Sequence, residues 1–474
     1  MIKKFLRPGI GLLILSAAIL SCSPQLVENL PTTDIARGLD DPTEESPATL
    51  APETETSVPE PTRFSIQAAT ENQPPITALY AALFQGELPE FVDTGGDLII
   101  TQAGASRGVH PEIPATFLPD TILIPQINSA AVQNLINFSI SLEGQAVLVE
   151  NGFLPASVTL TDQAGNSLEI NQPVMSVIST YGPATAFIYS VNAENRLVSA
   201  SYLGARDPLG AAVMEKIDPR FPEIMGDEFF TQEDFNIEQA ATLDPDLIVT
   251  SARTGWLDTV EELDLSVFLF DAETPDRLRE AMRLSGQLFG PQSTAQAEVW
   301  VAYYDSILNS IREQTALLSD DGRPRVLFTG TVPTRVASGD MYQTDIIEAA
   351  GGKSVSEELT GYWNDVNLEQ ILIWDPDVII VPPYGGASVS AITDSAEWQI
   401  LDAVQAGRVY QMPKLVVPWD TPAPDSVLGI VWMAQRLHPN LSGLECGTEA
   451  EYFFNTFYNY PITEDEIESI CSFE

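Results

Sequence analysis

Histidine, cysteine and lysine are scarce in this chain of 474 residues, and positive charge is scarce with them. The sequence holds two histidines, three cysteines and five lysines. Its 22 Lys and Arg stand against 67 Asp and Glu, which gives a formal net charge of −45. A surface this acidic repels nucleic acid and anionic lipid, so we exclude both as partners.

Residues and motifs for catalysis are also missing. His110 and His438 each stand next to a proline, which indicates structural or surface roles rather than a catalytic base or a zinc site. The chain has no Gly-x-Ser-x-Gly motif, no phosphate-binding P-loop and no Cys-x-x-Cys pair. We therefore expect no catalytic residue, no metal ligand and no cofactor. Carboxylate pairs of the glycosidase kind stay open, because 67 acids supply many pairs, and ligand binding without turnover would separate the two cases.

The N-terminus has the features of an export signal. Two lysines and an arginine precede an apolar run, Gly9–Leu20, that is too short to span a membrane as a mature helix. The Ile-Leu-Ser-Cys sequence that follows resembles a bacterial lipobox, in which Cys22 becomes the lipidated first residue. We expect residues 1–22 to be a lipoprotein signal peptide. An ordinary signal peptide with a chance cysteine is the alternative.

A tether is predicted after this signal. Residues 23–65 are rich in Pro, Thr, Glu and Ser and almost free of aromatic side chains, a composition typical of disordered chain. A random coil of this length has an end-to-end distance of roughly 36 Å. The folded part is thus expected outside the cytoplasmic membrane, at the cell surface or in the periplasm, with a lipid as its anchor.

An accessory segment is predicted at residues 66–157. A strand-like stretch, Thr121–Pro125, precedes a helical stretch, Ser129–Leu142, and the segment Glu143–Ala156. This order, with its Gly-Phe-x-Pro ending, resembles the C-terminal part of phosphate-, molybdate- and tungstate-type binding proteins. Because a whole domain of that family is far longer, we interpret the segment as a truncated relic or an accessory part.

A long helix is predicted at Ser293–Leu318, which contains neither glycine nor proline. Apolar residues from Val299 to Ile311 recur every four positions and form a stripe on one face. Ser293 and Gln296 have the spacing of a capping box. At about 1.5 Å per residue this helix would be about 39 Å long, the width of a domain.

An internal repeat lies on both sides of the predicted helix. Asn236–Val249 reads NIEQAATLDPDLIV, and Asn367–Ile380, 131 residues later, reads NLEQILIWDPDVII. In each copy the asparagine can cap a short helix, the Asp-Pro pair ends it, and an apolar run enters a buried parallel strand. The repeat therefore predicts an α/β fold with two lobes joined by a single long helix.

These motifs resemble those of the substrate-binding proteins of ABC transporters in the iron-siderophore, haem and vitamin B12 class. The resemblance extends over Val158–Ile467 and includes the two repeats and the segment Gly407–Pro439. It implies two Rossmann-like lobes in the helical-backbone periplasmic-binding fold. We expect the N-terminal lobe at residues 158–292, the inter-lobe helix at 293–318, the C-terminal lobe at 319–444 and a helical tail at 445–474.

The resemblance also implies a function. We expect a monomeric solute-binding component that captures a metal chelate, siderophore-like or cobalamin-like, and delivers it to an ABC permease and its ATPase. The short sequences Trp-Asn-Asp-Val and Pro-Trp-Asp resemble those in branches of this fold that include molybdate and tungstate binders, so an oxyanion is an alternative ligand. A ligand sensor without a transport role is the alternative from a different class.

Aromatic and cationic residues gather on loops that follow the predicted strands, where ligands bind in open α/β sheets. The two arginines among them are the most informative, because cations are rare here and Arg can hold an anionic ligand. The predicted ligand-binding residues are Tyr181, Arg253, Trp256, Arg335, Tyr362, Trp363, Tyr384, Trp419 and Asp420.

Two further assignments concern the surface and the tail. By resemblance to the family, Glu223 and Glu357, with Glu215 and Glu358 as neighbours, are candidates for contacts with arginines of the permease. Cys446 and Cys471 are the cysteines that remain after lipidation of Cys22, in a compartment where unpaired thiols are unusual, so we predict a disulfide between them. Two separate buried thiols are the alternative.

Overall fold

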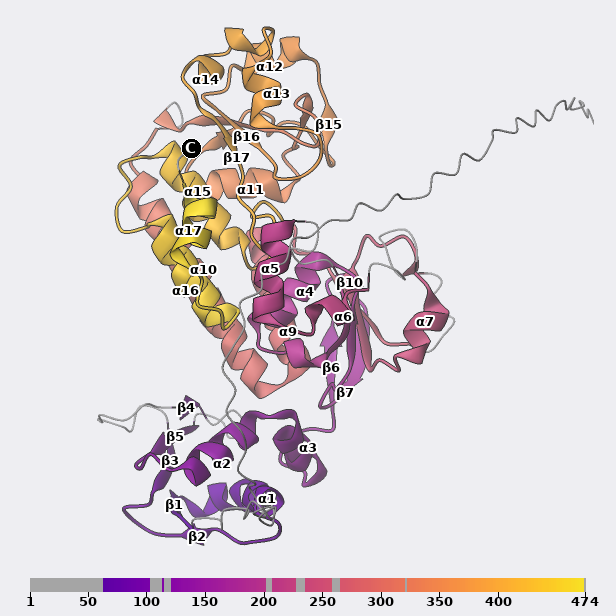
Figure 1. Ribbon diagram of the computed structural model, residues 1–474, viewed down its shortest axis with the longest axis vertical. Helices are drawn as coiled ribbons and strands as arrows, with labels where there is room; N and C mark the ends of the chain where they lie inside the picture. Colours follow the sequence, from indigo (N-terminus) through magenta and orange to yellow (C-terminus); the bar gives the residue numbers. More distant parts are fainter. Residues whose placement is uncertain are drawn as a thin grey trace, which may run out of the picture. The chain divides into compact units, whose positions relative to one another are not determined.

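The computed structural model describes residues 63–102, 113–114, 121–201, 207–226, 235–257, 265–319 and 322–472 (Figure 1). The predicted lipidation site Cys22, nearly all of the tether and His110 lie outside these ranges. Within them, none of the helices combines the length and the apolar character needed to cross a membrane.

Residues before the two lobes form a small α/β layer with a core of its own. Its sheet has the strand order β2-β1-β3-β5-β4, with β1 parallel to β2 and β3, and β5 antiparallel to its neighbours. Ile66, Leu79, Tyr80 and Leu135 are among the side chains buried in this core. The elements are β1 (Ser65–Ala68), α1 (Gln73–Leu83), β2 (Glu90–Phe91), β3 (Leu98–Gln102), β4 (Ile113–Pro114), β5 (Thr121–Pro125), α2 (Ala130–Ile140) and α3 (Leu142–Glu150).

The N-terminal lobe opens with a hairpin, β6 (Ser157–Thr161) and β7 (Ser167–Asn171), and continues into a sheet of four parallel strands. This sheet has the order β11-β10-β8-β9. Its elements are β8 (Val177–Ser179), α4 (Gly182–Ser190), β9 (Leu197–Ala200), α5 (Pro208–Ile217), α6 (Phe221–Ile224), α7 (Ile237–Thr242), β10 (Leu247–Ser251), β11 (Val267–Phe270) and α9 (Pro275–Phe289).

The C-terminal lobe repeats this plan with the strand order β14-β12-β16-β17, again all parallel. A short antiparallel pair, β13 (Arg335–Val336) and β15 (Asn364–Asp365), forms a separate two-stranded sheet just after β12. The other elements are β12 (Arg325–Phe328), α11 (Tyr342–Ala349), β14 (Lys353–Ser354), α12 (Leu368–Trp374), β16 (Val378–Val381), α13 (Val389–Thr393), α14 (Asp402–Gln405), β17 (Val409–Gln411) and α15 (Ser426–Leu437). In both sheets the strand that comes second in the chain lies on one side of the first strand. The third strand lies on the other side of the first, and the fourth lies beyond the third. Both lobes therefore share one topology. The predicted α/β fold with two lobes is confirmed.

The internal repeat explains how this shared topology is built. The side chain of Asn236 accepts a hydrogen bond from the backbone N–H of Gln239, and Asn367 accepts one from Gln370, so both predicted helix caps are present. The aspartate after each proline then accepts a hydrogen bond from the backbone at the start of the first strand of its lobe. The carboxylate of Asp246 accepts the backbone N–H of Ser176 at 2.9 Å. In the other lobe Asp377 accepts that of Arg325 at 2.7 Å.

The long helix is α10 (Pro291–Thr315), which contacts α4 and α9 of one lobe and α11 and α15 of the other. It starts earlier than predicted, because Pro291 fits the first helical position and Gly290, at φ 96°, precedes it. Ser293 therefore lies buried inside the helix, and the predicted capping box is wrong. The predicted stripe is wrong at Val299, which is exposed, whereas Tyr303, Ile307 and Ile311 are buried as expected. Trp300, next to Val299, is fully buried.

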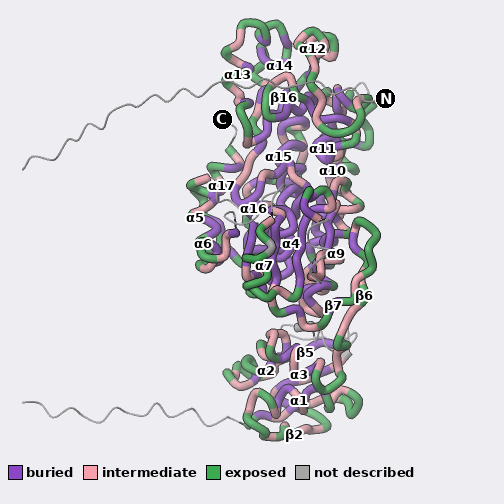
Figure 2. Tube along the Cα trace, turned by 90° about the vertical axis from the view of Figure 1, so that its right-hand side faces the viewer, coloured by how far each residue is buried: buried purple, intermediate pink, exposed green. Residues whose placement is uncertain are grey.

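The tail consists of α16 (Cys446–Phe457) and α17 (Glu464–Cys471), joined by the predicted disulfide between Cys446 and Cys471. The Tyr303 hydroxyl on α10 donates to Glu449 at 2.9 Å, and the Lys216 ammonium on α5 pairs with Glu466 at 2.9 Å. The tail thus contacts both the long helix and the N-terminal lobe. Figure 2 shows how completely α4 and α15 are buried between the surrounding elements.

The disulfide should stabilise the protein mainly by restricting the unfolded chain. Its two cysteines are 25 residues apart, for which loop closure predicts a loss of about 3 kcal/mol when the bond is removed. We expect the double variant Cys446→Ser/Cys471→Ser to lose this free energy of unfolding in a urea titration. Wild type treated with reductant should match the variant, and equal stability with and without the bond would contradict the prediction.

Asp425 at the start of α15 predicts a pH dependence of stability. Its side chain is fully buried, and burial raises its pKa to about 7 although the Tyr458 hydroxyl donates to it at 2.8 Å. In the unfolded chain this pKa is about 3.9. The folded state therefore binds a proton more tightly, so its stabilising contribution is present at low pH and is lost as the pH rises from about 4 to 7.

The neutral variant Asp425→Asn removes this titration. Between pH 5 and pH 8, we expect wild type to lose on the order of 2 kcal/mol of unfolding free energy relative to the variant. The difference between the two proteins isolates Asp425, because all other groups titrate in both. Parallel pH profiles of the two proteins in chemical denaturation would show that the carboxyl group does not titrate in this range.

Candidate functional site

The candidate site lies on loops that follow the carboxyl ends of the parallel strands, as predicted. Tyr181 follows β8 and precedes α4, and Arg253 follows β10. In the C-terminal lobe, the turn that leads to Arg335 follows β12, and Tyr384 follows β16. Because each sheet is parallel, the loops of one lobe meet at one edge of its sheet.

Arg253 of the N-terminal lobe contacts the C-terminal lobe. Its guanidinium carbon lies 5.1 Å from the ring centroid of Tyr362, a cation–π contact from the N-terminal lobe to the C-terminal lobe. The same guanidinium forms an ion pair with Glu273 and lies 3.9 Å from Asp271. Its side chain stays 36% exposed. The arginine is thus positioned between the lobes but is already neutralised by carboxylates of its own lobe.

Trp363 and Arg335 form a second group around Gly330. A β-carbon placed on Gly330 would lie 2.9 Å from the Trp363 ring and 3.3 Å from Cγ of Arg335. The absence of a side chain at this position therefore lets the indole lie against the backbone. The Arg335 side chain is 44% exposed, and its Nε lies 3.9 Å from Asp365 on the paired strand β15. This arginine is held more loosely than Arg253.

Asp420 is the centre of a third, buried group. Tyr384 donates its hydroxyl hydrogen to Oδ2 of Asp420 at 2.6 Å, and the Gln343 amide donates to the backbone carbonyl of Asp420 at 3.0 Å. Burial raises the pKa of Asp420 to about 6, against the effect of these donors. Oδ1 of Asp420 and Oε1 of Gln343 have no hydrogen-bond partner among the described residues. Gln343 did not stand out in the sequence, because a glutamine in the first turn of a helix is ordinarily exposed.

Two of the predicted ligand residues belong to the core instead. Trp256 is 4% exposed and stacks on Phe235 with ring centroids 4.3 Å apart. Trp419 is fully buried and packs so closely on Gly429 that a β-carbon there would lie 2.5 Å from the Trp419 carbonyl oxygen. Their assignment to the ligand surface is therefore corrected.

The other residues singled out in the sequence lie on the surface or make a structural contact. Glu223 on α6 and Glu357 after β14 are exposed, and Glu357 pairs with Lys353 at 3.2 Å. Burial lowers the pKa of His438, whose Nε2 lies 3.2 Å from the carbonyl oxygen of Gly351, so this histidine has a structural contact. Across the described ranges, no three His, Cys, Asp or Glu side chains are grouped so that they could hold a metal ion.

Comparison with known proteins agrees with this architecture. Residues 228–415 match the family described as periplasmic binding protein. This match covers 188 of the 474 residues. Among solved structures, a periplasmic solute-binding protein from Veillonella parvula is 23% identical and aligns with 66% of this chain and 96% of its own, at a TM-score of 0.58. The molybdate-bound MolA structure from Haemophilus influenzae is 18% identical and aligns with 65% of this chain and 99% of its own, also at 0.58. These likenesses show the fold.

The curated relatives differ in the ligand for which each is named. The molybdate-binding protein MolA of Haemophilus influenzae is 26% identical over 204 residues, which cover 43% of this chain and 57% of that protein. A vitamin B12-binding protein of Photorhabdus laumondii is 22% identical over 210 residues, 44% of this chain and 70% of that one. The matched stretch thus spans little more than half the length of the first relative.

Proposed function

We propose that this chain is the lipid-anchored solute-binding component of an ABC importer. It would capture a small ligand between its lobes, close slightly about α10, and deliver the ligand to a membrane permease and its ATPase. The observation that carries this proposal is the contact of Arg253 from one lobe with Tyr362 from the other, at loops that follow strand ends. Capture and release need no chemical step, so the protein would not be an enzyme.

The two arginines favour an anionic ligand. A chain with a net charge of −45 repels anions at long range, so local cations must overcome that field. Arg253 is paired at a partly exposed rim, where such pairs contribute little free energy, and a ligand can therefore take over the guanidinium from Glu273. Arg335, with its carboxylate at 3.9 Å, is available for the same purpose. A ligand that reaches both would be bound best when the lobes are closed.

A metal chelate with carboxylate or other anionic groups, siderophore-like or cobalamin-like, is the first ligand class we propose. Tyr181, Tyr362, Trp363 and Tyr384 would supply flat surfaces for its rings. A molybdate or tungstate oxyanion is the second candidate. It is supported by the similarity to a protein named for molybdate binding and by the planar donor fork of each arginine.

Truncating either arginine should weaken binding. We expect Arg253→Ala and Arg335→Ala each to lose about 2–3 kcal/mol of affinity, because the anion loses a charge-assisted hydrogen-bond partner. Native mass spectrometry with metal analysis would identify the bound ligand, and calorimetry would then measure the affinities. Arg283→Ala is the matched control, since Arg283 is similarly exposed and ion-paired, to Glu298 on α10. A neutral or cationic ligand, or unchanged affinity in both variants, would refute this role.

Docking to the permease gives a separate prediction. Glu223 and Glu357, one on each lobe, would meet cationic groups of the permease. The double reversal Glu223→Lys/Glu357→Lys should abolish ligand uptake by cells. It should leave ligand affinity intact, because neither glutamate lies on the loops after strand ends that form the candidate site. Reversal of two other exposed glutamates, Glu397 and Glu451, is the control. Uptake that survives the first reversal, or fails equally in the control, would contradict the assignment.

A further inference from the structure

Lys414 is a third cation on the loops after strand ends, and nothing in its sequence surroundings singled it out. It follows β17, in the segment that also carries Asp420. A backbone contact fixes the bend of this segment, because the N–H of Trp419 donates to the carbonyl oxygen of Pro413 at 3.1 Å. Since β17 is parallel to β16, Lys414 lies at the same edge of the sheet as Tyr384.

The ammonium group of Lys414 pairs with a carboxylate of the other lobe. Its Nζ lies 2.8 Å from Oδ2 of Asp207, which comes after β9 and caps α5. Asp207 also accepts a hydrogen bond from the backbone N–H of Leu209 at 2.9 Å. Burial raises the pKa of Asp207, but the Lys414 ammonium and the backbone donors outweigh it and hold the pKa below its ordinary value. A charged carboxylate of the N-terminal lobe thus holds Lys414 of the C-terminal lobe.

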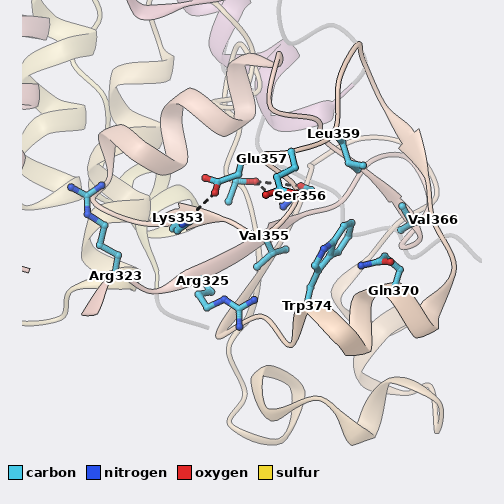
Figure 3. A pocket seen from close by; sticks show the side chains of 12 residues that line it. Arg323, Arg325, Lys353, Val355, Ser356, Glu357, Leu359, Val366, Gln370 and Trp374 are labelled. Atoms are coloured by element: carbon cyan, nitrogen blue, oxygen red, sulfur yellow. Dashed lines mark hydrogen bonds and ion pairs between the residues drawn. The ribbon is translucent and has the colours of Figure 1, made fainter. Parts of the chain in front are cut away.

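The other lysines in the described part of the chain do not connect the lobes. Lys216 pairs with the tail, and Lys353 pairs with Glu357 four positions later at 3.2 Å. Figure 3 shows this second pair beside a hollow at the first residues of β12 and β14, at the opposite end of the strands from the candidate site. Among the ion pairs of the described ranges, that of Lys414 with Asp207 is the one that runs from the N-terminal to the C-terminal lobe.

The contacts between the lobes enclose the candidate loops in the strand order. In the sheet β11-β10-β8-β9, Arg253 follows β10 and Asp207 comes after β9, so Tyr181 after β8 lies between them. In the sheet β14-β12-β16-β17, Tyr362 comes after β14 and Lys414 after β17, so the candidate loops after β12 and β16 lie between these two. A cation therefore stands at each end of the candidate site, Arg253 at one and Lys414 at the other.

The pair of Lys414 with Asp207 is weak enough for an anionic ligand to displace. The two side chains are 33% and 27% exposed, and an ion pair in contact with solvent contributes little free energy. A carboxylate or oxyanion of the ligand forms an equivalent charge-assisted bond with the ammonium group. Asp207 then keeps the backbone donors at the start of α5, so it is not left without partners.

We propose that Lys414 binds the anionic ligand, and that Asp207 is a built-in competitor that occupies Lys414 until the ligand takes its place. This inference rests on the proposed function, since it requires an anionic ligand between the lobes. An ion pair that only holds the lobes together is the competing explanation. In that case the loss of either partner weakens binding, whereas competition gives the two partners opposite effects.

The probes are molybdate and the ferric citrate complex, an oxyanion and an anionic metal chelate, with affinities measured by calorimetry. We expect Lys414→Gln to bind a probe at least about tenfold more weakly, because a charge-assisted contact is lost. Asp207→Asn should bind it about two- to fivefold more tightly, since the gain cannot exceed the strength of a partly exposed ion pair. Asparagine also caps helices, so this variant retains the start of α5.

Two control variants change the charge by the same amount at other places. Lys353→Gln removes an ion-paired cation of the C-terminal lobe, and Glu298→Gln removes an exposed carboxylate of α10 that pairs with Arg283. Both should leave affinity unchanged, which separates a local contact from the long-range field of the protein. The double variant Asp207→Asn/Lys414→Gln should bind like Lys414→Gln alone, because the tightening requires Lys414.

Three results would overturn the proposal and leave the proposed function intact. They are weaker binding in both single variants, unchanged affinity in Lys414→Gln while Arg253→Ala weakens binding, and tightening in Glu298→Gln equal to that in Asp207→Asn. A wild-type protein that binds neither probe would instead contradict the anionic ligand of the proposed function, and the inference would fall with it.

Discussion

The packing of α10 is the constraint on which the rest of the structure depends. Trp300, Tyr304 and Ile311 are fully buried on this helix, and the same apolar core includes strand residues of both lobes, such as Val249 and Val326. Each lobe therefore needs the helix to complete its own core. A connection of this kind allows small rotations of the lobes, because a larger one would expose apolar side chains from both at once.

The tail reinforces this connection. Its helices bond α10 through Tyr303 and the N-terminal lobe through Lys216, while the disulfide holds the two tail helices to each other. The ring of Tyr458 stacks on that of Tyr189, which brings the tail against α4 as well. Between the lobes themselves, Lys414 pairs with Asp207 at 2.8 Å. These contacts connect the tail with α10 and the N-terminal lobe, and the two lobes with each other.

The excess of acidic residues determines what most of the few cationic side chains contact. Most exposed arginines of the N-terminal lobe are engaged with nearby carboxylates, and Arg253 is one of them. Two acids are buried instead. Because burial removes Asp420 and Asp425 from water, the pKa values of both carboxyl groups rise.

The sequence by itself determined the parts of this protein that follow from local pattern. The repeat at Asn236 and Asn367 predicted two lobes of one design, because a cap, a chain-reversing Asp-Pro and an apolar run act within a few residues. Compartment and cysteine count likewise predicted the disulfide. Tertiary structure alone decided which aromatic side chains face solvent. Trp256 and Tyr362 both stand on loops after strands, yet stacking on Phe235 buries the first, and the second is 57% exposed. It also decided the role of Gln343, since its partner Asp420 comes from a distant part of the chain.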